Sequence, residues 1–309
     1  MELKKAIQGF KIDRLSSGFS PNTINNYIFH LSKFVDYLGN PELEKISSQD
    51  IKDYFYYLKS EKRISASSHH AVWKSVRSFF NWASAEFGLE RPDNIPSPKY
   101  QSKPISPFSN KEIYAIISAC DRTGPAKTEK RIPFTMTRPT AKRDKAIILF
   151  LLDTGIRVSE LSRLKVGDVF LETGEVIINP FLSGKKSRSR IVYIGKTARK
   201  AVWSYLADRG DATEEQPLFI ARSGRRMTRD SILKIVKSIG RRAGVQRCHP
   251  HRFRHTFAIQ YLRNGGDVFT LQRLLGHSSL EMVRQYLALA DTDAAEAHRK
   301  ASPVDRWGL

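Results

Sequence analysis

A cluster of prolines constrains the architecture of this chain more than any other feature. Five of its 14 prolines lie within one short polar stretch, from Pro92 to Pro107. Proline donates no backbone hydrogen bond and forces the residue before it into an extended conformation, so neither a helix nor a central strand continues through this stretch. The cluster therefore predicts a linker in the 309-residue chain. We expect a domain over residues 1–91, a linker over 92–108, a larger domain over 109–290 and a tail over 291–309.

The residues before the linker have the apolar spacing of helices. Ser20 followed by Pro21 indicates a helix start, because the serine side chain caps backbone N–H groups and proline suits the first turn. A second start lies at Ser47 to Asp50. Apolar side chains recur every three or four residues and are expected to form a helical core. They are Ile24, Tyr27, Ile28, Leu31, Phe34, Val35 and Leu38, then Ile51, Tyr54, Phe55 and Leu58, then Val72, Val76, Phe79, Phe80 and Ala83.

The residues after the linker predict a mixed domain. Ser109 and Glu112 have the spacing of a capping box at a helix start. Two strands, about 175–179 and 190–194, flank a polar loop and predict a β-hairpin. The residues from Thr123 to Thr140 are expected to be a loop. Further helices are expected over about 141–153, 197–208, 229–243, 250–263 and 268–275, with a last one from Ser278, where Glu281 would complete a capping box.

The charge of the chain points to a polyanionic partner. Lys and Arg number 52 against 31 Asp and Glu, which gives a net charge of +21. Residues 1–105 hold 15 of the basic and 11 of the acidic residues, so +17 of the net charge falls on residues 106–309. Such an excess is typical of proteins that bind nucleic acid.

Three further features predict that the protein works beside DNA inside the cell. The longest apolar run, Ala146–Leu152, has 7 residues, whereas a membrane span needs about 20. The first residues also lack the pattern of a secretory signal. The two cysteines, Cys120 and Cys248, lack metal-ligand spacing and fit a reducing compartment. We expect a cytoplasmic, nucleoid-associated protein with no membrane partner.

Six residues of the basic domain could form one site for an anion. Pro250 suits the first position of a helix, so His251 and Arg254 would project from one face near a helix N-terminus, which itself attracts anions. The same spacing also occurs on solvated faces, and Arg157 could simply pair with Glu160. The full set, in chain order, is Arg157, Lys185, His251, Arg254, His277 and Tyr286.

Taken together, these residues resemble the tyrosine recombinase, or phage integrase, family. The family pattern is Thr-Gly-x-Arg-x-x-Glu-Leu, a hairpin lysine, His-x-x-Arg-His, Leu-Gly-His and a final tyrosine. This chain has Thr154-Gly-Ile-Arg157-Val-Ser-Glu160-Leu161, Lys185, His251-Arg-Phe-Arg254-His255, Leu275-Gly-His277 and Tyr286 in that order. The helix that begins at Ser20-Pro21 is similar to the family's core-binding domain.

The resemblance implies a mainly α fold. The first domain would be a helical, SAM-like core-binding domain, and the second an α+β tyrosine recombinase catalytic domain with a small antiparallel sheet. The length leaves no room for an additional arm-binding domain, so we expect the simpler Xer-like or Cre-like arrangement.

The chemistry of a phosphodiester suggests a role for each residue. A phenol with a pKa near 10 is a poor nucleophile, so positive charge must surround the phosphate that Tyr286 attacks. Arg157 and Arg254 would hold the nonbridging oxygens. The histidines at 251 and 277 would donate to the phosphate or accept the tyrosine proton, and Lys185 would protonate the leaving 5′ oxygen. We expect neither a metal nor another cofactor, and Lys186, in the same loop, stays the alternative to Lys185.

The resemblance also implies what the enzyme does and with which partners. It implies site-specific integration, excision or resolution of double-stranded DNA through a 3′-phosphotyrosine and a Holliday junction. A homotetramer on synapsed DNA would carry this out, with accessory or directionality factors as further partners. The tail would dock on the neighbouring subunit, with Trp307 as its anchor. Glu160 and His255 are expected to support the site from behind, and Lys186, Arg188 and Arg190 to contact DNA phosphates.

Three other functions stay open on the sequence alone. A type IB topoisomerase uses similar phosphotyrosyl chemistry, although the helical first domain favours a recombinase. A metal nuclease could recruit Cys248, His249, His251 and His255, but no carboxylate cluster lies nearby. A DNA-binding regulator without activity would explain the charge but not the ordered set.

Overall fold

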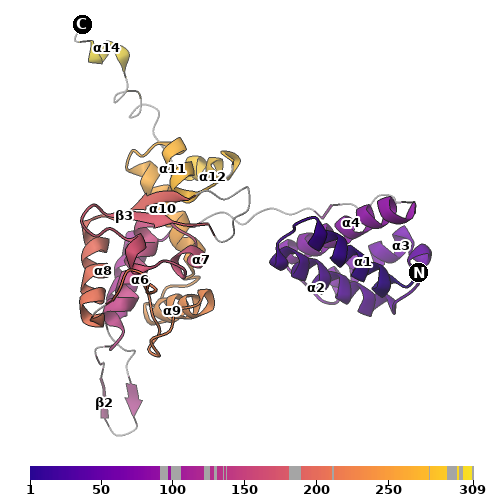
Figure 1. Ribbon diagram of the computed structural model, residues 1–309, viewed down its shortest axis with the longest axis horizontal. Coiled ribbons are helices and arrows are strands. Elements are labelled where there is room, and N and C mark those ends of the chain that lie inside the picture. The colour runs from indigo at the N-terminus through magenta and orange to yellow at the C-terminus, as the bar shows by residue number, and fades with distance from the viewer. Residues whose placement is uncertain are drawn as a thin grey trace. The chain divides into compact units, whose positions relative to one another are not determined.

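The computed structural model separates the chain into two compact units, residues 1–104 and 105–309 (Figure 1). Both are built mainly from helices, as predicted. Much of the predicted linker lies outside the described residues, so its boundaries stay a prediction. The structure describes residues 1–90, 97–98, 106–121, 126–128, 131–134, 136, 138–180, 189–210, 212–277, 279–290, 298 and 302–307.

The first unit packs its helices around aromatic side chains. The Ser20 side chain accepts a hydrogen bond from the Thr23 N–H with Pro21 at the first helical position, so α2 begins where the sequence predicts. The predicted core is confirmed, with Phe34 and Phe79 fully buried. The ring of Phe10 meets that of Phe79 edge to face at 5.7 Å. The elements are α1 (Leu3–Ser16), α2 (Pro21–Leu38), a 3₁₀ turn at Leu43–Lys45, α3 (Ser48–Ser60) and α4 (Ala66–Phe87).

Helix α1 was not predicted. Its buried side chains, Leu3, Ala6, Ile7 and Phe10, have helical spacing but lie within the first eight of its 14 residues. Ile12 and Leu15, further along the helix, are exposed and obscure the apolar face in the sequence.

The second unit is arranged around one buried helix. Helix α6 (Ala141–Thr154) contacts α5 (Asn110–Asp121), α8 (Lys196–Arg209) and α10 (Pro250–Arg263), and it lies beside α8 in Figure 1. Ser109 and Glu112 form the predicted capping box before α5. The remaining helices are α7 (Val158–Leu161), a 3₁₀ turn at Val166–Asp168, α9 (Arg229–Arg242), α11 (Val268–Leu275), α12 (Glu281–Ala290) and α14 (Pro303–Arg306).

Two short hairpins complete this unit. Strands β3 (Glu175–Ile178) and β4 (Arg190–Tyr193) pair antiparallel, with Ile178 opposite Arg190, as the sequence predicts. A second antiparallel pair, β1 (Ala126–Thr128) and β2 (Arg131–Phe134), lies where we expected a loop, and that expectation is wrong. Prolines suggested the loop, but each strand of a two-stranded ribbon has an unpaired edge, where proline is tolerated.

Helices α10, α11 and α12 enclose a small core of their own. His249 caps α10, since its Nδ1 accepts the Arg252 N–H at 3.3 Å. Helix α11 ends at Gly276, whose φ of 64° is left-handed. The predicted cap of the last helix, Ser278, lies outside the described residues. The side chains of this core are Ala258, Ile259, Leu262, Leu271, Leu275, Val283 and Tyr286. Nowhere in the described ranges is a helix long and apolar enough to cross a membrane.

Candidate active site

Arg254 joins the ends of two helices. It lies on α10 with only 4% of its surface exposed. Its Nη1 donates to the carbonyl of Gly155, which follows α6, at 2.9 Å, and its Nη2 donates to the carbonyl of Leu275, the last residue of α11, at 2.7 Å. Because Arg157 and His277 each lie two residues beyond these carbonyls, Arg254 brings both into one site.

The guanidinium of Arg254 stays cationic although it is buried. Burial, and then the charge of Arg157, lower the pKa of Arg254 to about 10. The group is therefore protonated at neutral pH. Because two cations, Arg254 and Arg157, lie close together in a partly buried site, an anion bound between them would be strongly stabilised.

Glu160 orients the second arginine. Its carboxylate accepts the backbone N–H of Arg157 at 2.8 Å and the Nη1 of Arg157 at 3.2 Å. The side chain of Arg157 is 39% exposed, so it is the more accessible of the two arginines. Burial alone would raise the pKa of Glu160, but the hydrogen bond and charge of Arg190 and the contacts with Arg157 outweigh it and lower the pKa. Glu160 is thus a charged group that holds Arg157 in place, and its role in the reaction stays a prediction.

Arg190 has a different position from the one we predicted. We expected it to contact DNA phosphates, yet its side chain is only 16% exposed. Both terminal nitrogens donate to Glu160, at 3.0 and 2.8 Å, and Nε donates to the carbonyl of Leu274 at 2.8 Å. The prediction is corrected: the guanidinium of Arg190, which was expected to face DNA, is paired with the buried carboxylate of Glu160.

His277 carries an unsatisfied donor. Its Nε2 lies 2.7 Å from Nη2 of Arg254. A guanidinium can only donate, so Nε2 accepts and the ring proton lies on Nδ1. Burial, Arg254 and Arg157 lower the pKa of His277 to about 4, which keeps the ring neutral. Nδ1 is buried and has no hydrogen-bond partner among the described residues.

Tyr286 contacts His255 directly. The phenol hydroxyl lies 2.9 Å from Nδ1 of His255, and its ring is nearly parallel to that of His277, with 6.4 Å between centroids. The residue is 2% exposed, and burial raises the pKa of Tyr286, which Arg254 partly offsets. Burial and the neighbouring His251 lower the pKa of His255 to about 4. We had assigned His255 a supporting role; the structure instead brings it into contact with Tyr286, the predicted nucleophile.

Of the remaining residues singled out in the sequence, the structure describes His251 and the two cysteines but not the residues of the loop at 181–188. His251 lies at the exposed start of α10, and burial of part of its ring together with Arg254 lowers its pKa. Burial raises the thiol pKa of Cys120 to about 12 and of Cys248 to about 11, so neither thiol is reactive at neutral pH. Within the described ranges, no group of His, Cys, Asp or Glu is arranged to hold a metal. The predicted Lys185, Lys186 and Arg188 lie outside the described residues.

The fold and the site together define a class, the enzymes that transfer DNA strands through a tyrosine. Comparison with known proteins identifies the family. The model of the phage integrase family matches residues 108–293, and that of the phage integrase N-terminal SAM-like domain matches residues 7–86. The chain belongs to the phage integrase family and is a tyrosine recombinase, so the family and the fold predicted from the sequence are confirmed.

Individual relatives match over nearly the whole chain. Tyrosine recombinase XerD of Bifidobacterium longum is 30% identical over 304 residues, which cover 94% of each chain. The crystal structure of XerA recombinase is similar at 29% identity and a TM-score of 0.52, covering 98% of this chain and 99% of that one. The Tn1549 transposon integrase, in complex with a circular intermediate DNA, shares the fold at 19% identity and a TM-score of 0.76, covering 97% and 99%.

Proposed function

We propose that this tyrosine recombinase performs site-specific DNA recombination in which Tyr286 forms a 3′-phosphotyrosine. The observation that carries the proposal is the contact between the Tyr286 hydroxyl and the neutral His255, beside Arg254 and His277. A neutral imidazole can take a proton from a phenol, and the cation next to it favours the phenolate that would attack phosphorus.

In the proposed reaction the scissile phosphate accepts hydrogen bonds from donors in the site, one of which, Nδ1–H of His277, has no partner among the described residues. Arg157 and Arg254 hold its nonbridging oxygens, and the unpaired Nδ1–H of His277 donates to one of them. The Tyr286 oxygen forms a bond to phosphorus while the bond to the 5′ oxygen breaks. The phenol proton passes to His255, and Lys185 protonates the 5′ oxygen. A 5′ hydroxyl from another strand reverses the step, so no ATP is consumed.

The resting position of Tyr286 implies a movement before reaction. With 2% of its surface exposed, the side chain cannot meet a DNA phosphate where it lies. We propose that DNA binding shifts α12 so that the hydroxyl leaves the interior while the phosphate enters beside Arg157. The buried contact with His255 is then the resting position of the nucleophile, in which the phenol passes its proton to His255 before its oxygen moves to the phosphate.

The proposed partners are double-stranded DNA and further copies of this chain. We propose a homotetramer on synapsed DNA, in the cytoplasm, in which the tail couples neighbouring subunits. Trp307 and Val304 are 70% and 53% exposed, which suits an anchor that a second copy would cover. Deleting residues 291–309 should leave half-site binding intact but abolish the synaptic tetramer; recombination at the normal rate by the truncated protein would exclude the coupling.

Covalent trapping on a nicked suicide substrate tests the chemistry. A half-site duplex is first selected from a random pool with the Tyr286→Phe protein, which keeps the helix packing but lacks the attacking oxygen. We expect a covalent adduct with the wild-type protein and none with Tyr286→Phe, at equal DNA binding. Adducts that persist in the variant would move the nucleophile elsewhere.

The same substrate separates the other functions. An inactive regulator forms no adduct, and a metal nuclease loses activity in EDTA, whereas the proposed reaction continues. Relaxation of supercoiled plasmid that lacks the selected site would favour a topoisomerase.

A further inference from the structure

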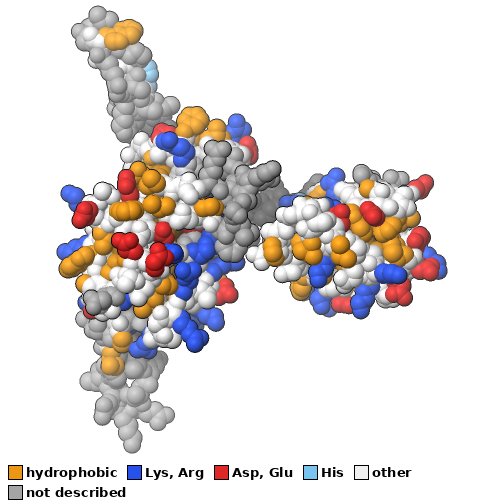
Figure 2. Space-filling model, viewed as in Figure 1, with side chains coloured by type: hydrophobic (Ala, Val, Ile, Leu, Met, Phe, Trp, Pro, Cys, Tyr) orange, Lys and Arg blue, Asp and Glu red, His pale blue; other side chains and the backbone are white. Residues whose placement is uncertain are grey.

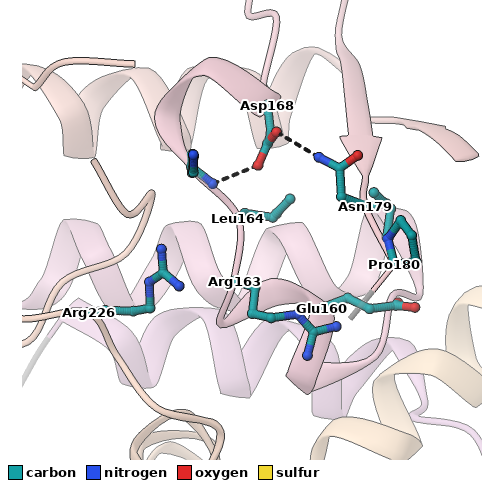
Figure 3. Close-up of a pocket in the computed structure, with 9 residues that line it drawn as sticks. Glu160, Arg163, Leu164, Asp168, Asn179, Pro180 and Arg226 are labelled. Carbon is teal, nitrogen blue, oxygen red and sulfur yellow. Dashed lines mark hydrogen bonds between the residues drawn. The ribbon is translucent and has the colours of Figure 1, made fainter. Parts of the chain in front are cut away.

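A small cavity opens beside Glu160, on the flank of the candidate active site. Its volume is about 220 Å³. Sites for drug-sized ligands occupy about 300–1,000 Å³, so this cavity suits one compact group rather than a cofactor. Arg163 and Arg226 line one part of it, and Asp168 and Asn179 line another (Figure 3).

The acidic groups of this cavity already have partners. The carboxylate of Glu160 binds Arg157 and Arg190. Asp168 accepts the backbone N–H of Lys165 at 2.8 Å and the side-chain amide of Asn179 at 3.3 Å, the two contacts dashed in Figure 3. Both carboxylates are therefore held in place by contacts other than Arg226.

The cationic groups favour an anion inside. In Figure 3, Arg163 lies between Glu160 and Arg226. Burial lowers the pKa of Arg163; Glu160 opposes this shift, and the charge of Arg226 adds to it, because like charges repel. The side chain of Arg226 is exposed at the cavity and makes no hydrogen bond or ion pair with any residue that the structure describes.

The surroundings identify the kind of anion. Asn179 and Pro180 line the cavity at the start of the chain segment that carries Lys185. Glu160, which also lines the cavity, holds Arg157. Figure 2 shows Lys and Arg side chains gathered over the region of α7 and α9. Arg222, Arg225 and Arg229 are exposed and lie within four positions of Arg226 in the sequence. A surface of this kind follows a polyanion rather than a single free ion.

We propose that this cavity binds one backbone phosphate of the DNA, a phosphate other than the scissile one, with Arg226 as the direct ligand and Arg163 as a supporting charge. The inference rests on the proposed function, because it takes DNA as the substrate. The contact would set the position of the strand relative to Arg157 and carry no base information, as phosphate contacts do.

Replacing single DNA phosphates by uncharged methylphosphonates tests this site. Methylphosphonates are placed one at a time along both strands of the selected half-site, and binding is measured in the Tyr286→Phe background. At one phosphate the neutral substitution should weaken binding about 10-fold, the loss of one charged hydrogen bond. In Arg226→Ala that same substitution should have no further effect, and the slope of log affinity against log salt should fall by about 1.

The matched control is Arg225→Ala, which removes the same charge from the neighbouring, exposed position outside the cavity. It should leave the sensitivity at that phosphate unchanged. The proposal is overturned if Arg226→Ala keeps the parent's methylphosphonate profile, or if Arg225→Ala loses the same phosphate. It is also overturned if Arg226→Ala weakens only the binding of inorganic phosphate, since the site would then serve a free ion. Adduct formation by the wild-type protein reports on the proposed function separately.

Discussion

Helix α2 in the first unit and helix α6 in the second both end at a glycine in the left-handed conformation, Gly39 with φ of 76° and Gly155 with φ of 59°. A Cβ added at Gly39 would meet no atom within 4 Å, whereas one added at Gly155 would lie 2.4 Å from the ring of Phe257. The carbonyl of Gly155 also accepts a hydrogen bond from Arg254. A left-handed glycine therefore ends a helix in both units, but only Gly155 also holds a residue of the candidate site, through its carbonyl.

The aromatic core of the first unit and the candidate site of the second also differ in what holds them together. The first relies on aromatic rings such as those of Phe10 and Phe79, and its capping bonds join residues three apart, as from Thr23 to Ser20. In the second unit, Arg254 bonds to residues 99 and 21 positions away. Non-directional packing tolerates small errors, whereas a buried charge needs its partners in place. Changes in the second unit should therefore affect both stability and activity.

The largest effect is expected from Arg254→Ala, which removes the link between the ends of α6 and α11. Adduct formation on the suicide substrate should slow about 100-fold or more, the scale of losing one preorganised anion contact. The first unit should keep its hydrogen-exchange protection. The control is Arg273→Ala, an exposed arginine of α11 in the same unit, and a near-normal rate with Arg254→Ala would contradict the assignment.

A glycine pair tests the contrast between helix ends. Gly155→Ala combines left-handed strain with overpacking against Phe257 and should cost about 3 kcal/mol of unfolding free energy. Gly39→Ala meets only the strain and should cost about 1 kcal/mol. Urea unfolding followed by hydrogen exchange in each unit measures both, and equal costs would mean that the environment of Gly155 carries no special weight.

Arg190→Met separates support of the site from contact with DNA. Losing its bonds to Glu160 should cost about 2 kcal/mol in the second unit, because hydrogen bonds to a charged group are strong. The salt dependence of half-site binding should stay unchanged, since the guanidinium faces the protein. A shallower salt slope with unchanged stability would restore the phosphate contact that the sequence suggested.

The last effect concerns pH. The pKa values of His255 and His277 are lowered to about 4 in the folded protein, against about 6.5 when unfolded. The unfolded chain therefore binds more protons in between, so the unfolding free energy of the second unit should fall as pH drops from about 6.5 towards 4. His255→Asn should flatten this dependence, and unfolding free energies that are equal at about pH 7 and pH 5 would contradict it.

Much of the fold could be predicted from the sequence because its determinants are local. The serine cap and first-turn proline of α2, the capping box before α5 and the start of α10 at Pro250 each depend on residues at most three apart. The order of the motifs was enough to predict the family. Helix α1 and the β1–β2 hairpin were not predicted, since the exposed Ile12 and Leu15 obscure the apolar face of α1 and strand β2 contains a proline.

The residues near Tyr286 were named from the sequence, but which of them touch was decided by tertiary structure. His255 and Tyr286 are 31 positions apart, and only the packing of α12 on α10 brings Nδ1 to the phenol. Arg190 and Glu160 are 30 apart, so the sequence could not distinguish an arginine facing DNA from one facing a buried carboxylate. Spacing determines which side chains share a helix face, whereas the partner across the interface depends on how the helices pack.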